Sequence, residues 1–329
     1  MPALAAENLA KSYPVKTALR SASLEVAPGE LFCLSGPDGA GKTTLIRILA
    51  GTLKPDSGRL SVLGYDGLAR PEALRRAIGY MPQRFAIYAD LTAEENLDFY
   101  CAFYGLDARS AKQRVEEMLV LTRLERFRGF RAGNLSGGMK QKLVLGCALV
   151  HEPELLLLDE PTTGIDPLSR REFWGILNEY LAQGKTIVYS SVYLEEALRA
   201  NRIALVSEGE IAVCDTPDRL LARAEGRRRE LGMGNGEWGR TEGIRHALER
   251  SGAVVSIQRT GKGLGILLSE AADAEQRVRS ALREVGAEAP LAEAAPTLED
   301  VFVLLAGGPM QNAECRVQNP EWRKRKEER

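Results

Sequence analysis

Apolar residues occur in short continuous runs that are separated by segments with helical spacing. The runs are GELFCLSG, PDSGRLSVLGYD, IGYMPQ, ELLLLDEP, KTIVYSS and RIALVSEGEIAV. Several are too continuously apolar for strands with one solvent-exposed face, so they predict buried strands of a mainly parallel sheet. After the first run, Leu45, Ile46, Ile48 and Leu49 recur on one face of a helix. The pattern therefore predicts an α/β protein.

A long stretch between IGYMPQ and ELLLLDEP has helical rather than strand periodicity. It runs from TAEENLDFYCAFYG through AKQRVEEMLVLTRL to GGMKQKLVLGCALV. Its apolar positions recur every three or four residues. We expect a helical subdomain, at about residues 85–152, inserted between two strands of the sheet.

The composition changes around residue 222, where AEGRRRELGMGNGEWG is rich in Gly and Arg. We therefore expect a first domain at 1–222 and a small α/β domain at 223–308. Residues 309–329 are polar and predict a flexible tail. The tail contains RKRK at 323–326, which is either solvated or in contact with anionic lipid. No second copy of the first half is found.

Charge and cysteine content exclude several classes of protein. The 44 Lys and Arg balance 45 Asp and Glu, for a net charge of −1, so we expect no nucleic-acid partner. The five cysteines are widely spaced and include no CxxC pair, which is typical of a reduced cytosolic chain. The N-terminus does not resemble a signal peptide, and no apolar run approaches the roughly 20 residues that cross a bilayer.

The segment GPDGAGKT, residues 36–43, matches the P-loop pattern G-x-x-x-x-G-K-[ST] between a strand and a helix. In such a loop, backbone N–H groups surround phosphate oxygens, the lysine reaches the terminal phosphates and the hydroxyl binds Mg²⁺. The predicted nucleotide-binding residues are Gly36, Pro37, Asp38, Gly39, Ala40, Gly41, Lys42, Thr43 and Thr44.

A second element, LLLLDE, predicts a buried strand that ends in Asp159 and Glu160. Taken alone, the two carboxylates could simply cap a turn. In P-loop proteins, however, an aspartate at this place holds Mg²⁺, and a neighbouring carboxylate orients or deprotonates the attacking water. We predict Asp159 and Thr43 as metal ligands, and Glu160 and Lys42 as catalytic residues.

The third element is NLSGGMKQK, residues 134–142, at the start of a predicted helix. Ser136 could be an ordinary N-cap, or Ser136, Gly137 and Gly138 could form a second anion site. With the other two motifs, it makes the chain resemble the ATP-binding subunits of ABC transporters, whose signature reads LSGGQ. Met139 departs from the last position, as in the branch that serves multidrug and ABC-2-type exporters. LEDVF at 298–302 is similar to a C-terminal extension in those exporters.

The resemblance implies further roles. Tyr13 is at the position of an aromatic residue that stacks on adenine, and Gln83 matches a glutamine that reaches Mg²⁺. Asp166, in GIDP, matches a loop that crosses a dimer interface. The family binds ATP and Mg²⁺ and dimerises head-to-tail, so that each signature meets the ATP of the other subunit. The resemblance also implies an ABC-2-type membrane permease as partner and a cytoplasmic location on the inner face of the plasma membrane.

One expected residue is missing from SSVYLEEA, at 190–197. The family has a histidine that contacts the γ-phosphate where this chain has Val192. The only histidines are His151, before the ELLLLDEP strand, and His246, in the second domain, and neither is expected to substitute. The chain is then half of a heterodimer with one slow site, or a homodimer in which Ser191 or Tyr193 replaces the histidine. A regulatory module with little hydrolysis is the alternative function.

Aromatic residues cluster after Gln83, where the permease is expected to dock. They are Phe85, Tyr88, Phe99, Tyr100, Phe103 and Tyr104. Some are expected in the core and the others at the interface, because aromatic residues are enriched at protein interfaces.

Overall fold

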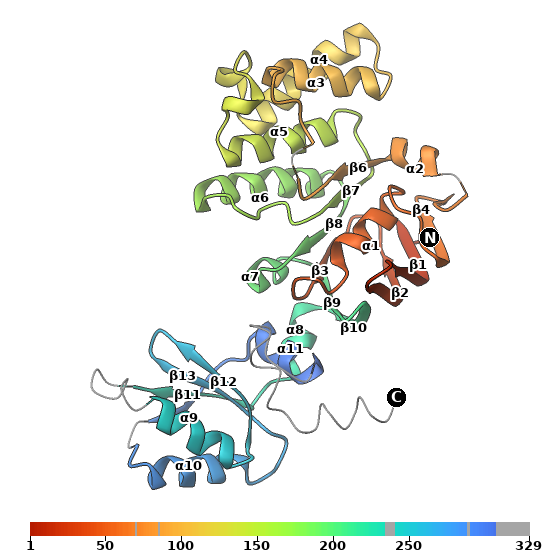
Figure 1. The fold of residues 1–329 in the computed structure, drawn as a ribbon. Helices are drawn as coiled ribbons and strands as arrows, with labels where there is room; N and C mark the ends of the chain where they lie inside the picture. The colour runs from red at the N-terminus through yellow and green to blue at the C-terminus, as the bar shows by residue number, and fades with distance from the viewer. Residues whose placement is uncertain (70, 85, 234–240, 288–289, 307–329) are drawn as a thin grey trace. The chain divides into compact units, whose positions relative to one another are not determined.

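The computed structural model describes residues 1–69, 71–84, 86–233, 241–287 and 290–306, which form two compact units, 1–214 and 215 onward (Figure 1). The strands of the first unit are β1 (Leu4–Ser12), β2 (Thr17–Val26), β3 (Leu31–Ser35), β4 (Ser57–Val62), β5 (Tyr65–Asp66), β6 (Ile78–Met81), β7 (Leu155–Leu158), β8 (Thr186–Ser191), β9 (Arg202–Ser207) and β10 (Glu210–Asp215). Its α-helices are α1 (Lys42–Leu49), α2 (Pro71–Ala77), α3 (Ala93–Phe103), α4 (Ala108–Thr122), α5 (Gly137–Leu149), α6 (Pro167–Ala182) and α7 (Leu194–Ala197).

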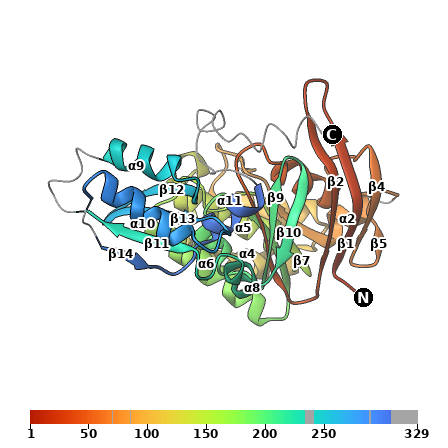
Figure 2. The ribbon, with the colours of Figure 1, turned by 90° about the horizontal axis from the view of Figure 1, so that it is seen from below.

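All ten strands belong to one sheet, in the order β5-β4-β1-β2-β10-β9-β3-β8-β7-β6. Strands β9, β3, β8, β7 and β6 pair in parallel, whereas β1, β2, β4 and β5 pair antiparallel and lie side by side in Figure 2. The parallel half consists of the continuously apolar runs, and every residue of β3, β7 and β8 is buried. The predicted α/β class is confirmed.

The first two strands are absent from the sequence prediction. Strand β1 does not keep a regular alternation, because its pairing register with β2 shifts after Ala6 and Asn8 adopts a positive φ of 50°. A bulge of this kind moves later side chains to the other face of the sheet, so a period-two pattern cannot reveal the strand. The antiparallel strands nevertheless pack on α1 around Leu9, Leu45 and Ile46.

Helices α3, α4 and α5 occupy the stretch predicted as helical (Figure 1). Thr92 and Glu95 form a capping box at α3, and Asp107 caps α4. Helix α5 is tied to α6 by an ion pair of 2.8 Å between Lys142 Nζ and Glu172. The helices therefore form a connected group that joins the sheet domain through α5, which contacts both β6 and α6.

The second unit contains α8 (Pro217–Ala222), β11 (Arg228–Gly232), α9 (Thr241–Arg250), β12 (Val254–Thr260), β13 (Gly263–Leu268), α10 (Ala274–Glu284), β14 (Leu291–Glu293) and α11 (Leu298–Ala306). The antiparallel order β12-β13-β11-β14 with this chain order is the split βαββαβ arrangement. Packing places α8 in this unit, so the division falls at residue 214 rather than at the 222 predicted from composition. The predicted tail at 309–329, with RKRK, lies outside the described residues.

The LEDVF segment has a structural role in the second unit. Asp300 is buried and accepts two hydrogen bonds from Arg228, of 2.7 and 2.8 Å. It also accepts from the backbone and hydroxyl of Thr297, while Val301 and Phe302 are buried. Arg228 therefore anchors α11 to the sheet through β11. Within the described part of the chain, no helix combines the length and the apolar character that a membrane crossing requires.

Candidate nucleotide site

Four predicted elements meet at one edge of the parallel sheet. The P-loop follows β3, Gln83 follows β6, Asp159 and Glu160 follow β7, and Val192 follows β8. Because these strands are parallel, their carboxyl ends lie together, and this edge is where open α/β sheets bind ligands. Residues 36–41 form the loop between β3 and α1, and Lys42, Thr43 and Thr44 begin α1.

The P-loop needs glycine at two positions because other backbone atoms come very close. A Cβ on Gly36 would lie 2.1 Å from Val206 O, and one on Gly41 would lie 2.5 Å from Ala18 O. Gly41 also has a φ of +112°, which side chains rarely adopt. The loop is closed by a hydrogen bond of 3.2 Å from Ala40 N to Pro37 O. Packing therefore maintains the loop that brings N–H groups to the start of α1.

Lys42 is buried, with 4% of its surface exposed. Its ammonium donates to Gly36 O at 2.8 Å and to Pro37 O at 3.0 Å, and it lies 3.9 Å from a Glu160 oxygen. Burial lowers the pKa of Lys42, although Glu160, Asp38 and Asp159 act to raise it. The ammonium is thus held inside its own loop. A phosphate bound there would be attracted strongly to it, because charges that are removed from water interact strongly.

Asp159 lies at the base of the site, next to Thr43. The Thr43 hydroxyl donates to Asp159 Oδ1 at 3.1 Å, and Ser190 Oγ donates to the same oxygen at 2.8 Å. The other oxygen, Oδ2, is buried without a hydrogen-bond partner. Burial raises the pKa of Asp159, and the two hydroxyl hydrogen bonds partly oppose this. An orphaned carboxylate oxygen beside a hydroxyl fits Mg²⁺, which prefers oxygen ligands and keeps much of its shell for water and phosphate.

Glu160 follows in a strained turn, with a φ of 49°. Left-handed backbone at a non-glycine residue costs about 1–3 kcal/mol and persists only where surrounding contacts maintain it. Glu160 N donates to Ser190 Oγ at 2.8 Å, and Thr163 N donates to Glu160 O at 3.2 Å. Its carboxylate accepts from Gln83 Nε2 at 3.1 Å and from Thr163 Oγ1 at 3.4 Å. Glu160 therefore contacts two other predicted residues, Gln83 and Lys42.

Tyr13 lies in the turn between β1 and β2 and is 42% exposed, so its ring is accessible to a base. The same turn reaches the P-loop, because Lys16 Nζ donates to Gly39 O at 2.8 Å. The sequence did not single out Lys16, which lacks a motif of its own. Ser190 was also missed, although the β7–β8 register, which pairs Leu158 with Tyr189, places it opposite Asp159.

The predicted second anion site is at the start of α5, where Ser136 Oγ accepts from Met139 N at 3.3 Å. A Cβ on Gly138 would lie 2.1 Å from Ser169 Oγ, and Asp166 caps α6 at the same place through Ser169 N. Among the described residues, no hydrogen bond or ion pair joins this helix start to the P-loop. The structure therefore brings the signature to the GIDP loop rather than to its own nucleotide site.

The residues around Val192 have partners of their own. Ser191 is buried and donates to Glu196 Oε2 at 3.1 Å, while it accepts from Tyr193 N at 3.0 Å. The Arg170 guanidinium lies 4.8 Å above the Tyr193 ring. Val192 itself is half-buried. Both side chains that could replace the missing histidine are thus engaged in other contacts.

His151, the histidine of the first unit, lies away from this strand end. His151 Nε2 bonds to Ile78 O at 3.0 Å, at the amino-terminal end of β6, and its ring stacks on Tyr104 at 3.6 Å. Burial lowers the pKa of His151 to about 4, so it is neutral at pH 7. His246 lies on α9, in the second unit. His151 therefore lies at the opposite edge of the sheet from Val192. This agrees with the expectation that His151 does not take the place of the family histidine.

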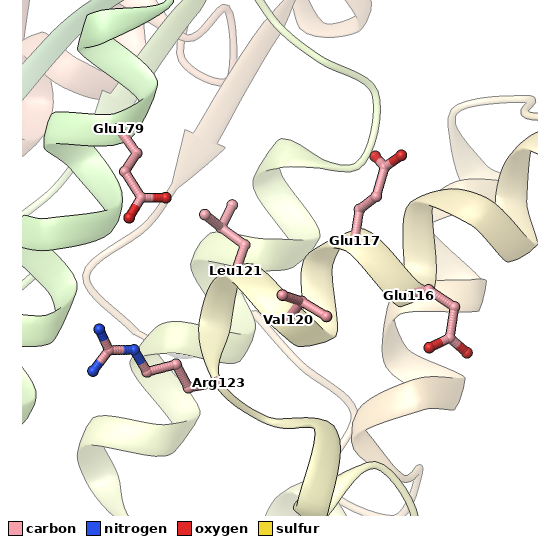
Figure 3. Close-up of a pocket in the computed structure, with 6 residues that line it drawn as sticks. All are labelled: Glu116, Glu117, Val120, Leu121, Arg123 and Glu179. Carbon is pink, nitrogen blue, oxygen red and sulfur yellow. The ribbon is translucent and has the colours of Figure 1, made fainter.

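A cavity of about 540 Å³ opens between α4 and α6, away from the strand ends (Figure 3). It is lined by Glu116, Glu117, Val120, Leu121, Arg123 and Glu179. Three carboxylates against one guanidinium would repel a polyphosphate, so this cavity is unsuited to a nucleotide. Among the described residues, no three His, Cys, Asp or Glu side chains gather to hold a metal ion by themselves.

A buried lysine in a glycine-rich loop, a hydroxyl beside an aspartate and a neighbouring glutamate define a P-loop ATPase site. A family model described as "ABC transporter" matches residues 19–163. The chain is 39% identical over 307 residues to the probable multidrug ABC transporter ATP-binding protein YbhF of Escherichia coli, covering 92% of this chain and 51% of that protein. It is 36% identical over 312 residues to the daunorubicin resistance ATP-binding protein DrrA3 of Streptomyces coeruleorubidus, covering 93% and 96%.

The fold agrees with these matches. The dimeric structure of the ATP-binding cassette MJ0796 in a post-hydrolysis state, bound to ADP and Pi, matches with a TM-score of 0.60 at 27% identity, covering 65% of this chain and 98% of that one. The chain belongs to the ABC transporter family, as one of its ATP-binding subunits. It spans about half the length of YbhF.

Proposed function

We propose that this chain binds and hydrolyses ATP to drive a separate membrane subunit of an exporter. The observation that carries the proposal is the contact of Glu160 with both Lys42 and Gln83, beside the Thr43–Asp159 pair. A carboxylate that is buried against a phosphate-binding cation is suited to act on the water that attacks the γ-phosphate. Export is supported by relatives whose names concern drug resistance and multidrug transport.

Each group has a chemical role in this proposal. The loop at residues 36–41 and Lys42 bind the phosphates, and Tyr13 stacks on adenine. Thr43, Asp159 and Gln83 would hold Mg²⁺, which would neutralise phosphate charge. Glu160 holds the attacking water and accepts its proton, and Gln83 and Thr163 orient the carboxylate. Positioned groups of this kind typically contribute about 10² to 10⁴ in rate.

The second subunit would supply what this chain lacks at its own P-loop. The start of α5 carries an N-capping serine and two glycines, and within the chain it contacts the Gly164–Ser169 segment rather than the P-loop. A head-to-tail dimer would place Ser136, Gly137 and Gly138 on the ATP of the partner, with Asp166 near the interface. The dimeric structure of the MJ0796 cassette supports the formation of a dimer.

Val192 makes the site on this P-loop slow and favours pairing with a different subunit. The hydroxyl of Ser191 is used by Glu196, and the Tyr193 ring lies under Arg170, so replacement of the histidine by either residue would need that residue's contact to change. The retained Glu160 argues for residual hydrolysis. In a heterodimer, the intact signature of this chain would complete the faster site of its partner.

An ABC-2-type permease would dock on an aromatic stripe. The stripe consists of Tyr88, which precedes α3, of Phe99, Tyr100 and Phe103 in α3, and of Tyr104 at its C-terminus. Tyr88, Phe99 and Phe103 are 49%, 39% and 70% exposed, and consecutive rings pack edge-to-face. Tyr100 and Tyr104 are half-buried, so none of these five rings is fully in the core, and Phe85 lies outside the described residues. Docking at this surface would hold the chain on the cytoplasmic face of the plasma membrane.

The docking surface is tested with Tyr88→Ala, and Tyr65→Ala serves as a control because Tyr65 has a similar exposure of 40% on β5. Only Tyr88→Ala should lower export by vesicles that contain the complex, while ATP binding is the same in both variants. Equal export by both variants would remove the stripe as the docking surface.

The central test is steady-state ATP hydrolysis by the purified chain, with Val192→His for comparison and Glu160→Gln as the blank. We expect the wild type to turn over slightly faster than the blank, and Val192→His to turn over at least tenfold faster. If the wild type equals the blank and Val192→His restores turnover, the chain is half of an asymmetric pair. If neither exceeds the blank, the chain is a nucleotide-binding regulatory module. Fast wild-type turnover that the histidine does not increase would favour a homodimeric motor.

A further inference from the structure

We propose that Glu196 is a positioning residue for the Glu160 carboxylate, an inference that rests on the proposed ATP hydrolysis. Glu196 is in α7, just after β8, and only 4% of its surface is exposed. A buried carboxylate is costly unless hydrogen bonds and opposite charges compensate for the lost water. Its partners therefore indicate which parts of the fold it holds together.

Three separate segments converge on this carboxylate. The Thr162 hydroxyl, two residues after Glu160, lies 2.8 and 2.7 Å from the two Glu196 oxygens. Ser191 Oγ, at the end of β8, donates to Oε2 at 3.1 Å. Arg170 Nε, in the first turn of α6, is 3.4 Å from Oε1. Glu196 thus connects the turn after β7, the end of β8 and the helix that follows the GIDP loop.

The connection to Thr162 bears directly on Glu160. Thr162 is 1% exposed, and it lies inside the turn that Thr163 N closes on Glu160 O. Thr163 Oγ1 also contacts the Glu160 carboxylate at 3.4 Å. The left-handed backbone of Glu160 persists only while such contacts hold the turn. Without Glu196, the buried Thr162 hydroxyl would lose its partner and the turn would relax, which would shift the Glu160 side chain.

Other contacts of Glu196 make this a rigid anchor. Its backbone carbonyl accepts from the buried Tyr189 hydroxyl at 2.7 Å, so α7 is fixed to β8 as well. Arg170, which pairs with the carboxylate, also covers the Tyr193 ring. A movement of the β8 end would therefore be transmitted to the Glu160 turn through one carboxylate. A misplacement of about 1 Å in a catalytic group can reduce the rate about 10²-fold.

The test compares Glu196→Ala and Glu196→Gln with Glu195→Ala, in which an exposed glutamate of the same helix is removed. Turnover, the Kd of a fluorescent ATP analogue and amide hydrogen exchange at residues 159–163 are measured. We expect kcat to fall about ten- to hundredfold in Glu196→Ala, with Kd unchanged and faster exchange in the turn. Glu196→Gln keeps an acceptor for Thr162 and should recover part of the rate. Glu195→Ala should match the wild type.

A double variant, Glu196→Ala with Thr162→Val, should be no slower than the slower single variant, because both changes remove the same contact. Unchanged kcat and unchanged exchange in Glu196→Ala would overturn the proposal, as would an equal loss in Glu195→Ala. If the turnover of the wild type does not exceed that of the Glu160→Gln blank, the proposed hydrolysis fails. The positioning role of Glu196 is then decided by amide hydrogen exchange alone. Faster exchange only in the Glu196 variants then supports positioning, and unchanged exchange overturns it.

Discussion

The first unit contains two helix starts built from glycines, and they differ in what surrounds them. At the start of α1, Lys42, Thr43, Asp159 and Glu160 gather within hydrogen-bond or ion-pair distance. At the start of α5, Ser136 caps the helix, and its glycines pack on Gly164 and Ser169. Both starts present backbone N–H groups that attract anions, but only the first is supplied with a buried cation and two carboxylates.

The two helix starts therefore differ in function: both can bind an anion, but only the start of α1 has the groups for hydrolysis. The carboxylate at the start of α5, Asp166, caps α6 through Ser169 N, so this start is suited to contact a phosphate rather than to accept a proton from water. The two carboxylates with that capacity, Asp159 and Glu160, both follow β7, and the sheet holds them at the same edge as the P-loop that follows β3. Changes at the two helix starts should therefore have different consequences, and this can be measured.

The largest effect is expected for Gly41→Ala. The new Cβ would lie 2.5 Å from Ala18 O on a backbone with a φ of +112°, so the P-loop must distort. A strain of about 3 kcal/mol corresponds to a loss of roughly 100-fold in ATP affinity. Gly184→Ala is a matched control, since Gly184 has a φ of +79° and nothing lies within 4 Å of its added Cβ. Titration with a fluorescent ATP analogue should show weak binding for Gly41→Ala alone, and equal affinities would contradict the prediction.

A smaller effect is expected for Ser136→Ala, which removes the N-cap of α5. The loss destabilises the helix start by about 1 kcal/mol, or roughly fivefold in an equilibrium constant. Thr92→Ala removes the cap of α3 in the same way and serves as the control. Both variants should unfold at slightly lower temperatures and keep the Kd for ATP, but only Ser136→Ala should slow turnover by the assembled dimer. An increase in Kd for Ser136→Ala would mean that α5 contacts the nucleotide of its own chain.

The smallest effect is expected in the pH dependence of ATP binding. Burial lowers the pKa of Lys42, so its ammonium loses a proton at a lower pH than an ordinary lysine. Bound phosphate favours the charged form and raises the pKa, so binding takes up a proton and ATP affinity falls as pH rises through the pKa of the free protein. Calorimetric titrations from pH 7 to 10 should show this decrease in the wild type. In Lys42→Met, affinity should be lower and nearly independent of pH, whereas a parallel decrease would assign the titration to another group.

Residues with local motifs were predicted best. The P-loop and the LLLLDE strand are continuous in sequence, and the structure places Thr43 beside Asp159 as their motif roles require. Strand β1 was missed because a bulge at Asn8 interrupts its alternation, and the pairing of β2 with β1 shifts register between Leu19 and Ala22. Lys16, Ser190 and Glu196 were missed for a different reason: each acts on the site through a partner that is distant in the chain, such as Gly39, Asp159 or Thr162.

The sequence by itself determined the class of the fold and the family, and it predicted the phosphate-binding and acidic residues, because these depend on short patterns with a fixed local geometry. Through the family resemblance it also predicted that Val192 occupies the position of a histidine. Only the tertiary structure decided that Ser191 and Tyr193 are engaged elsewhere, that Glu160 is held in a strained turn, and that Glu196 links that turn to β8. These facts depend on which buried groups satisfy one another, and burial pairs residues that are far apart in the sequence.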